Sequence, residues 1–201
     1  MSRYLLLAAF VCAWTFGSAQ ADDAVWRAEL EAYWAHLDAE FKDSVQTPLP
    51  KAERAGFKGL ERFPADPAYR IQARFEAQEG AVFGMRTNSD REPKYRSVGV
   101  LHFELEGRPQ RLTVYQNIAL SQLPDYVNYL FVPFTDLTNG EMTYGGGRYI
   151  DLQGPLGGKV ELDLNRAYNP YCAYGGNYSC PIPPQENHLE VSVLAGVRKF
   201  H

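Results

Sequence analysis

The chain has 201 residues, of which 45% are hydrophobic and 22% charged, so we expect a packed globular domain and not a disordered chain. Its formal net charge is -4 at pH 7. A slightly acidic chain of this kind does not have the excess of Lys and Arg that is typical of nucleic-acid-binding proteins or of polybasic segments that bind anionic membranes. We therefore expect no nucleic-acid partner and no polybasic attachment to a membrane surface.

Residues 1–21 have the features of a secretory signal peptide. Arg3 gives a positive start, residues 4–14 (YLLLAAFVCAW) form an apolar run, and residues 19–21 (AQA) offer a cleavage site. The apolar run is shorter than the ~20 residues that a membrane-spanning helix needs, and no later stretch comes close. We predict cleavage after Ala21, export to the periplasm or the exterior, and a mature chain without a transmembrane segment.

Removal of this segment takes away Cys12 and leaves Cys172 and Cys180. Two cysteines in an exported chain favour a disulfide, because that compartment has no reducing thiol pool. Their spacing is not the Cys-x-x-Cys of a redox-active pair, and no histidines stand near them in the spacing of a zinc site. We predict a Cys172–Cys180 disulfide, and neither a metal nor a cofactor.

The mature chain begins with a predicted amphipathic helix within residues 22–48. Its apolar residues recur every three or four positions, namely Trp26, Leu30, Tyr33, Trp34, Leu37 and Phe41. Asp22 and Asp23 suit the N-terminus of this helix, and Thr47-Pro48 ends it. We expect the aromatic stripe to pack on the protein's own sheet, although docking of a partner is an alternative. A short helical turn is expected at 51–55.

From Tyr69 onward the apolar pattern changes to a period of two, which is typical of half-buried strands. Turns rich in Gly, Pro and Asn separate the predicted strands, which are 69–76, 81–87, 101–105, 111–116, 128–134, 148–152, 159–164 and 188–194. Residues 69–201 therefore predict a mainly β body, an antiparallel barrel or sandwich of about eight strands. No linker divides the chain, so residues 22–201 are predicted to form one domain.

Sequence motifs identify no reaction. There is no His-Glu-x-x-His, no Gly-x-Ser-x-Gly and no Walker loop. The glycines at 145–147 precede a predicted strand, so the helix N-terminus that binds phosphate is missing. Residues 136–147 resemble a calcium loop only in part, because their twelfth position is glycine where a glutamate ligand is required.

Polar side chains, aromatic rings and glycines crowd together between Phe131 and Asn187. Rings supply contact area and polar groups orient a ligand, so this composition suits a pocket for a small polar molecule. It would equally suit a scaffold of tight turns, in which Asn and Asp side chains bond the backbone. The candidate ligand-binding residues are Asp136, Asn139, Tyr144, Arg148, Tyr149, Asp151, Asp163, Asn165, Tyr168 and Glu186.

Several stretches of the chain resemble one protein family, the bacterial domain of unknown function 1684. They are FKGL at 57–60, FPADP at 63–67, FTDLTNGEMTYGGGRYID at 134–151, NRAYNPYCAY at 165–174 and CPIPPQEN at 180–187. The resemblance covers essentially the whole mature chain. Because the family is uncharacterised, it implies no activity, but it marks Asp136, Asn139, Tyr144, Arg148, Tyr149, Asp151, Asn165, Tyr168, Asn169, Cys172, Cys180, Glu186 and Asn187.

Three functions stay open. The first is an exported β-scaffold module that binds a small polar molecule, such as a sugar or an amino-acid-like compound. The second is a hydrolase whose acid and base are a carboxylate pair drawn from Asp136, Asp151, Asp163 and Glu186. The third is an envelope structural protein that docks through the aromatic helix. Acidic side chains that converge in one pocket would favour the enzyme, and aromatic walls around one charge would favour binding. The sequence leaves the oligomeric state open.

Overall fold

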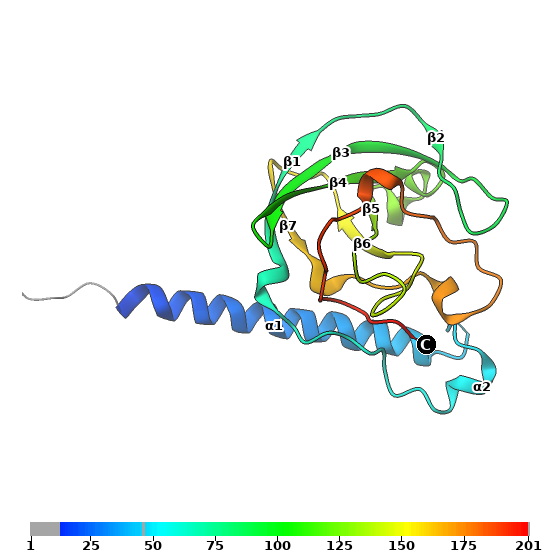
Figure 1. The fold of residues 1–201 in the computed structure, drawn as a ribbon, viewed down its shortest axis with the longest axis horizontal. Coiled ribbons are helices and arrows are strands. Elements are labelled where there is room, and N and C mark those ends of the chain that lie inside the picture. The colour runs from blue at the N-terminus through cyan, green and yellow to red at the C-terminus, as the bar shows by residue number, and fades with distance from the viewer. Residues whose placement is uncertain (1–12, 46, 201) are drawn as a thin grey trace, which may run out of the picture.

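The computed structural model describes residues 13–45 and 47–200, with side chains from residue 21 onward. Residues 1–12, which hold the charged start and most of the apolar run of the predicted signal peptide, lie outside the described residues. Helix α1 (Ala13–Lys42) runs below a curved sheet, and α2 (Lys51–Arg54) follows it (Figure 1). Among the described helices, none is both long and apolar enough to cross a membrane.

Seven strands of the described chain form one antiparallel sheet that curls into a half-barrel (Figure 1). They are β1 (Arg70–Ala77), β2 (Phe83–Gly84), β3 (Lys94–Leu105), β4 (Arg108–Asn117), β5 (Tyr129–Phe134), β6 (Arg148–Gln153) and β7 (Lys159–Asp163). Six follow the order β6-β5-β4-β3-β1-β7, and β2 pairs with β3. The predicted class, a mainly β fold with an N-terminal helix, is confirmed.

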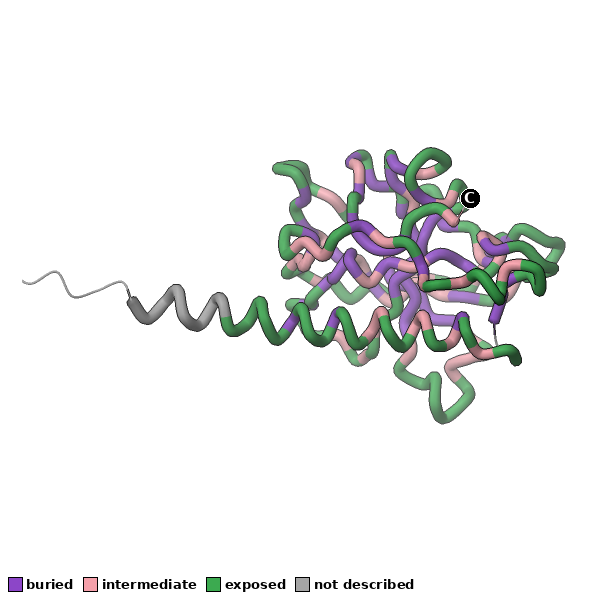
Figure 2. The backbone as a smooth tube through the Cα atoms, turned by 90° about the horizontal axis from the view of Figure 1, so that it is seen from below, coloured by how far each residue is buried: buried purple, intermediate pink, exposed green. Residues whose placement is uncertain are grey.

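The predicted stripe of α1 packs on the protein's own body. Trp26 donates from its indole nitrogen to the Asp163 carboxylate at 2.8 Å, and Trp34 donates to the backbone carbonyl of Asn165 at 3.1 Å. Trp26 and Leu30 are fully buried, whereas the opposite side of the helix is exposed (Figure 2). Alanines at every third or fourth position favour the helical conformation between these anchors. The helix is thus held by its aromatic face.

A bulge in β3 changes which residues of that strand point to each face of the sheet. The register with β4 shifts between Ser97 and Gly99. Odd-numbered residues before the bulge therefore point to one face of the sheet, and odd-numbered residues after it point to the other. Before the bulge Tyr95 joins an aromatic cluster, and after it Leu101 joins an aliphatic core. One face of the sheet therefore packs aliphatic side chains, and the other presents aromatic ones.

The predicted strand at 188–194 is wrong. Apolar residues alternate there, and Leu189, Val191 and Val193 are indeed buried in the aliphatic core. The segment nevertheless forms no continuous ladder. It has an isolated bridge between Thr135 and His188 and backbone bonds with residues 135–137, and beyond them its N–H groups bond side chains. The N–H of Val193 donates to the Asp136 carboxylate at 3.2 Å, and the N–H of Leu194 donates to the Tyr69 hydroxyl at 3.1 Å. Period-two burial can therefore arise without sheet pairing.

Other predicted boundaries also need correction. The strand expected at 81–87 shrinks to Phe83–Gly84, and the one at 101–105 is the end of the longer β3. The N-terminal helix begins at Ala13, so Asp22 and Asp23 lie within it and not at its N-terminus. It ends at Lys42 and not near residue 48, and the buried residues 47–49 follow it in a non-helical conformation. The short helix expected at 51–55 is present as α2.

A buried ion pair attaches this C-terminal segment to the sheet. Arg148 on β6 donates from Nη2 to the Asp136 carboxylate at 2.8 Å, and both side chains are 0% exposed. Arg148 also donates to the carbonyls of Val193, at 2.9 Å, and Ala195. Burial lowers the pKa of Arg148, whereas the Asp136 charge raises it. Each charge is therefore compensated by the other and by backbone groups that would otherwise lack partners.

We predict that Asp136→Asn destabilises the protein by about 3–5 kcal/mol, because it leaves the buried Arg148 guanidinium without its counter-charge. Urea unfolding at neutral pH measures the loss. Glu141→Gln is the matched control, since Glu141 is an exposed carboxylate on the same loop and its change should stay within about 0.5 kcal/mol. An Asp136→Asn loss as small as that of the control would contradict a structural role for the pair.

Candidate functional site

The open side of the half-barrel is bridged at two tyrosines. The N–H of Tyr149 on β6 donates to the carbonyl of Tyr168 at 2.9 Å, and the N–H of Tyr168 donates back at 3.0 Å. Tyr168 follows the short helix η4 (Leu164–Arg166), which comes directly after β7. Because β6 and β7 are the two ends of the strand order, this bridge joins them. The rings meet edge to face, with centroids 5.8 Å apart.

Beside this bridge lies a cavity of about 790 Å³, within the ~300–1,000 Å³ range of small-molecule sites. The second half of α1, strands β5 and β6 and the 168–181 loop contribute to its walls. We call it the tyrosine cavity, because nine tyrosines of the described chain line it: Tyr33, Tyr95, Tyr126, Tyr129, Tyr149, Tyr168, Tyr171, Tyr174 and Tyr178. Phe41 and Phe131 add two further rings.

Asp151 is the carboxylate that β6 presents to this cavity. Alternation along the strand places it on the same face as Tyr149, two residues earlier. Its Oδ1 accepts a hydrogen bond from the Tyr129 hydroxyl at 2.7 Å, and the Tyr168 hydroxyl lies 2.9 Å from both carboxylate oxygens. No Lys, Arg or His of the described residues forms an ion pair with it. The side chain stays accessible to solvent through the cavity.

The electrostatics of the site follow from its walls. Surrounding protein atoms raise the pKa of Asp151 by desolvation, while the hydrogen bonds from Tyr129 and Tyr168 lower it. Burial and the Asp151 charge raise the pKa values of Tyr129 and Tyr168 above the ordinary value, so both hydroxyls stay protonated and donate. Two protonated tyrosine hydroxyls thus surround the Asp151 carboxylate.

Most of the predicted site residues lie elsewhere and have structural partners. Asp136 and Arg148 are sealed in the core, and Asn139 holds the turn after Asp136 through bonds to its backbone N–H and to the Tyr144 carbonyl. Asp163 accepts from Trp26, Asn165 binds the backbone of Asp66, and Glu186 accepts from Tyr115 at 2.8 Å. Of the predicted residues, the tyrosine cavity gathers Tyr149, Asp151 and Tyr168.

The candidate residues Asp136, Arg148, Asp163 and Glu186 therefore do not line the tyrosine cavity with Tyr168. The polar residues of this segment were expected at a pocket because Asp, Asn and Arg suit a ligand site, yet here they satisfy buried backbone groups. The four carboxylates proposed as acid and base have separate partners, and Asp151 is the one of them in the tyrosine cavity. The described residues also hold no cluster of three His, Cys, Asp or Glu side chains that could bind a metal ion.

Cys172 and Cys180 are free thiols in the structure, so the predicted disulfide is not present there. The two residues are nevertheless neighbours, because the N–H of Cys172 donates to Cys180 Sγ at 3.3 Å. A hydrogen bond between the thiols lowers the pKa of Cys180 to about 7 and raises that of Cys172. Cys180 also lines the tyrosine cavity. The pair therefore lies at the edge of the site with its two sulfur atoms close together.

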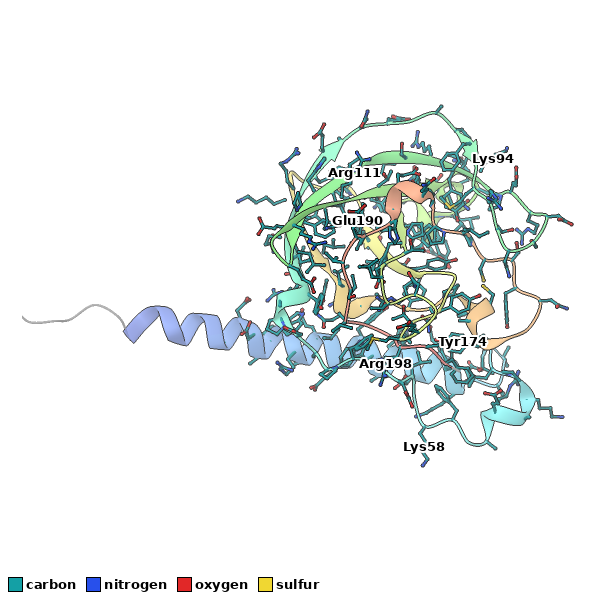
Figure 3. The ribbon with its side chains drawn as sticks, in the orientation of Figure 1. Lys58, Lys94, Arg111, Tyr174, Glu190 and Arg198 are labelled. Carbon is teal, nitrogen blue, oxygen red and sulfur yellow. The ribbon has the colours of Figure 1, made fainter. Side chains whose placement is uncertain are left out.

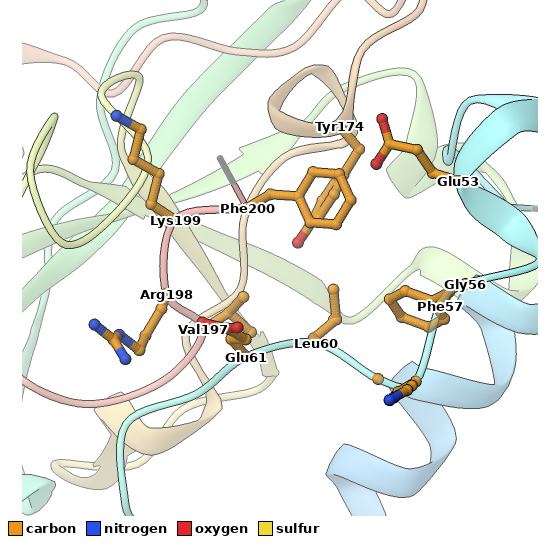
Figure 4. A pocket seen from close by; sticks show the side chains of 12 residues that line it. Glu53, Gly56, Phe57, Leu60, Glu61, Tyr174, Val197, Arg198, Lys199 and Phe200 are labelled. Carbon is orange, nitrogen blue, oxygen red and sulfur yellow. The ribbon is translucent and has the colours of Figure 1, made fainter.

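Two other hollows are less suited to a small ligand. An apolar one of about 420 Å³ is walled by Phe57, Leu60 and Tyr174, while Arg198 and Lys199 point away from Tyr174 (Figure 4). It adjoins the tyrosine cavity, since Leu60 and Tyr174 line both. A polar groove near Arg111 and Glu190 lies on another part of the molecule (Figure 3). In neither do aromatic rings surround a single oriented charge, as they do at Asp151.

Sequence reasoning missed most of the cavity wall. Tyr33 and Phe41 were assigned to helix packing, and Tyr126 and Tyr129 were not singled out at all. The available signal was compositional, because the chain has 13 tyrosines. Tyrosine combines a large apolar surface with a hydroxyl that needs a partner when buried. A concentration of it is therefore a hint of a semi-polar cavity, although only the fold shows which tyrosines meet.

The fold and the site together define a class: a β half-barrel braced by an N-terminal helix, with a tyrosine-lined cavity at its bridged edge. Residues 55–198 match the family described as a protein of unknown function, DUF1684, and the chain belongs to that family. The solution NMR structure of an uncharacterized protein from Haloarcula marismortui is similar, with 37% sequence identity and a TM-score of 0.70. The match covers 89% of this chain and 96% of that one. No curated protein matches.

We predict that Asp151→Asn leaves stability within about 0.5 kcal/mol of the parent or raises it slightly. An acid whose pKa is raised by folding opposes folding while it is ionised, and this opposition disappears as the pH falls through that pKa. Any gain from the amide should therefore be present at neutral pH and vanish in acid. Urea unfolding at both pH values measures it. A large loss at neutral pH would show that Asp151 holds the fold, as Asp136 does.

Proposed function

We propose that this protein is an exported module whose β scaffold binds a small polar ligand in the tyrosine cavity. The observation that carries the proposal is Asp151, a carboxylate without a cationic partner among the described residues, held by two tyrosine hydroxyls at an accessible cavity. A carboxylate that only supported the fold would be expected to have a cation or several backbone donors, as Asp136 has.

The two alternatives lack comparable support. A hydrolase would need a second carboxylate beside the first, whereas Asp136, Asp163 and Glu186 bond other partners. Glu40 also lines the cavity, but it pairs with His36 on the same helix at 3.3 Å. Docking through the aromatic helix would need a free stripe, and that stripe is packed on the protein's own body. Ligand binding is the function that the geometry favours.

Export is the second part of the proposal. The side chains of α1 between residues 21 and 25 are exposed, and Trp26 is the first of the described helix that is buried. Cleavage after Ala21 would therefore keep Trp26 and the later buried residues of α1 in the mature chain. In an oxidising compartment the adjacent thiols of Cys172 and Cys180 would then form the predicted disulfide, passing two electrons and two protons to an oxidised dithiol partner.

We predict that some sugars, amino acids or small amines raise the thermal midpoint of the parent protein. A ligand at ~100 times its Kd stabilises the protein by about 2.7 kcal/mol, which is roughly 5–10 °C for a domain of this size. Asn177→Trp should abolish the shift, because Asn177 is an exposed residue of the cavity wall and the indole would fill the opening. The measurement is differential scanning fluorimetry of both variants.

Gln72→Trp provides the matched control, since Gln72 is an exposed residue of β1 that is not part of the cavity wall. It introduces the same side chain and should leave the ligand shift unchanged. Equal shifts in all three proteins would place the ligand outside the tyrosine cavity. If no compound shifted the parent, the proposal of a small-ligand module would fail.

We predict that protein isolated from the cell envelope starts at Asp22 and carries no free thiol. Its intact mass should equal that of residues 22–201 less two hydrogen atoms, and iodoacetamide without reductant should add nothing. After reduction, two labels per chain are expected. An intact Met1 would contradict cleavage, and two labels without reductant would contradict the disulfide.

A further inference from the structure

The charges around the tyrosine cavity are unequally distributed. Four charged or titratable side chains other than tyrosine and cysteine line it: His36, Glu40, Arg91 and Asp151. His36 and Glu40 pair with each other, and Arg91 is exposed on the loop before β3. Asp151 is the group whose charge faces the cavity without a cationic partner among the described residues. The described lining thus holds two carboxylates and one arginine, and a ligand group placed beside Asp151 meets a negative charge.

The hydrogen bonding of Asp151 leaves room for one more donor. A carboxylate offers about four lone-pair sites, and the Tyr129 and Tyr168 hydroxyls occupy its oxygens with distances of 2.7–2.9 Å. Both hydroxyls are donors to Asp151, so they hold it in a fixed orientation. The described residues supply no cation to use the remaining capacity. The Asp151 carboxylate is thus held in place to accept a hydrogen bond from a donor outside the described residues.

The rings of the wall favour the same ligand charge. Tyr149 and Tyr168 stand at 89° to each other, and Phe131 meets Tyr149 at 73° with centroids 4.7 Å apart. Aromatic rings attract cations through the negative charge of their faces. The combination of several tyrosines with one carboxylate is the chemistry by which proteins bind ammonium groups.

We propose that the ligand of the tyrosine cavity is a small organic cation whose ammonium group contacts the carboxylate of Asp151 and the surrounding aromatic rings. This inference rests on the proposed binding function and names the class of its ligand. An anion would face the uncompensated charge of Asp151. A neutral sugar would leave that charge desolvated without a counter-ion, which is costly in a partly enclosed site. A primary, substituted or quaternary ammonium satisfies both the charge and the rings.

The test compares choline with dimethylbutanol, the neutral isostere in which carbon replaces the quaternary nitrogen. Isothermal titration calorimetry measures both on the parent and on Asp151→Asn. The parent should bind choline at least ten-fold more tightly than the isostere. Asp151→Asn retains the oxygen that accepts from the tyrosines, so it should fold, and it should bind the two compounds equally. Glu104→Gln, an exposed carboxylate of β3 away from the cavity, should behave like the parent.

Each outcome decides the inference. Selective binding of choline that is lost in Asp151→Asn supports it. Equal binding of both compounds by the parent overturns it, yet leaves the tyrosine cavity as a binding site. If neither compound binds at millimolar concentration, a cationic ligand of this size is excluded, and the separate screen with Asn177→Trp then decides the proposed function. If choline selectivity persists in Asp151→Asn, the carboxylate is not the recognising group, and the inference fails.

Discussion

Strand β6 carries side chains to opposite faces of the sheet, and both the core and the tyrosine cavity depend on that alternation. Arg148 and Ile150 point to the aliphatic side, where Arg148 binds Asp136 and the carbonyls of the C-terminal segment. Tyr149 and Asp151 point to the other side and line the cavity. A shift of β6 by one residue would exchange these sets and place a carboxylate in the core. The buried ion pair therefore also fixes the register that presents Asp151.

The molecule uses its polar residues in two distinct ways. Asp136, Asn165 and Asn187 are buried with several partners each, and they connect segments that the sheet does not pair. Asp151 has tyrosine hydroxyls alone and remains accessible. The three buried residues stabilise the fold. Asp151 lowers the stability locally, and the rest of the structure tolerates that loss. Site residues and scaffold residues in this segment are both rich in Asp and Tyr. The number of protein partners and the exposure of each carboxylate distinguish the two groups.

Periodicity predicted the elements whose apolar spacing is uninterrupted. The stripe of α1 and the alternation of β1 follow from apolar spacing, and the structure has both close to the expected residues. It failed where the pattern is interrupted or imitated. The bulge beyond Ser97 reverses the parity of β3, which hid residues 94–100 from the strand prediction. Residues 188–194 imitate a strand, because burial against a sheet also selects alternate apolar residues.

The candidate site was predictable only in part, since its members come from distant parts of the chain. Tyr149, Asp151 and Tyr168 were found because they lie in one dense segment, whereas Tyr33 and Tyr129 reach the cavity only through packing. The family match over residues 55–198 includes Asp151, Tyr129 and Tyr168 but ends short of α1. The carboxylate and its donors thus stand on the sheet and the bridge, which fix their geometry. The helix forms a separate wall, where a change of side chain would alter the size of the cavity without disturbing the charge.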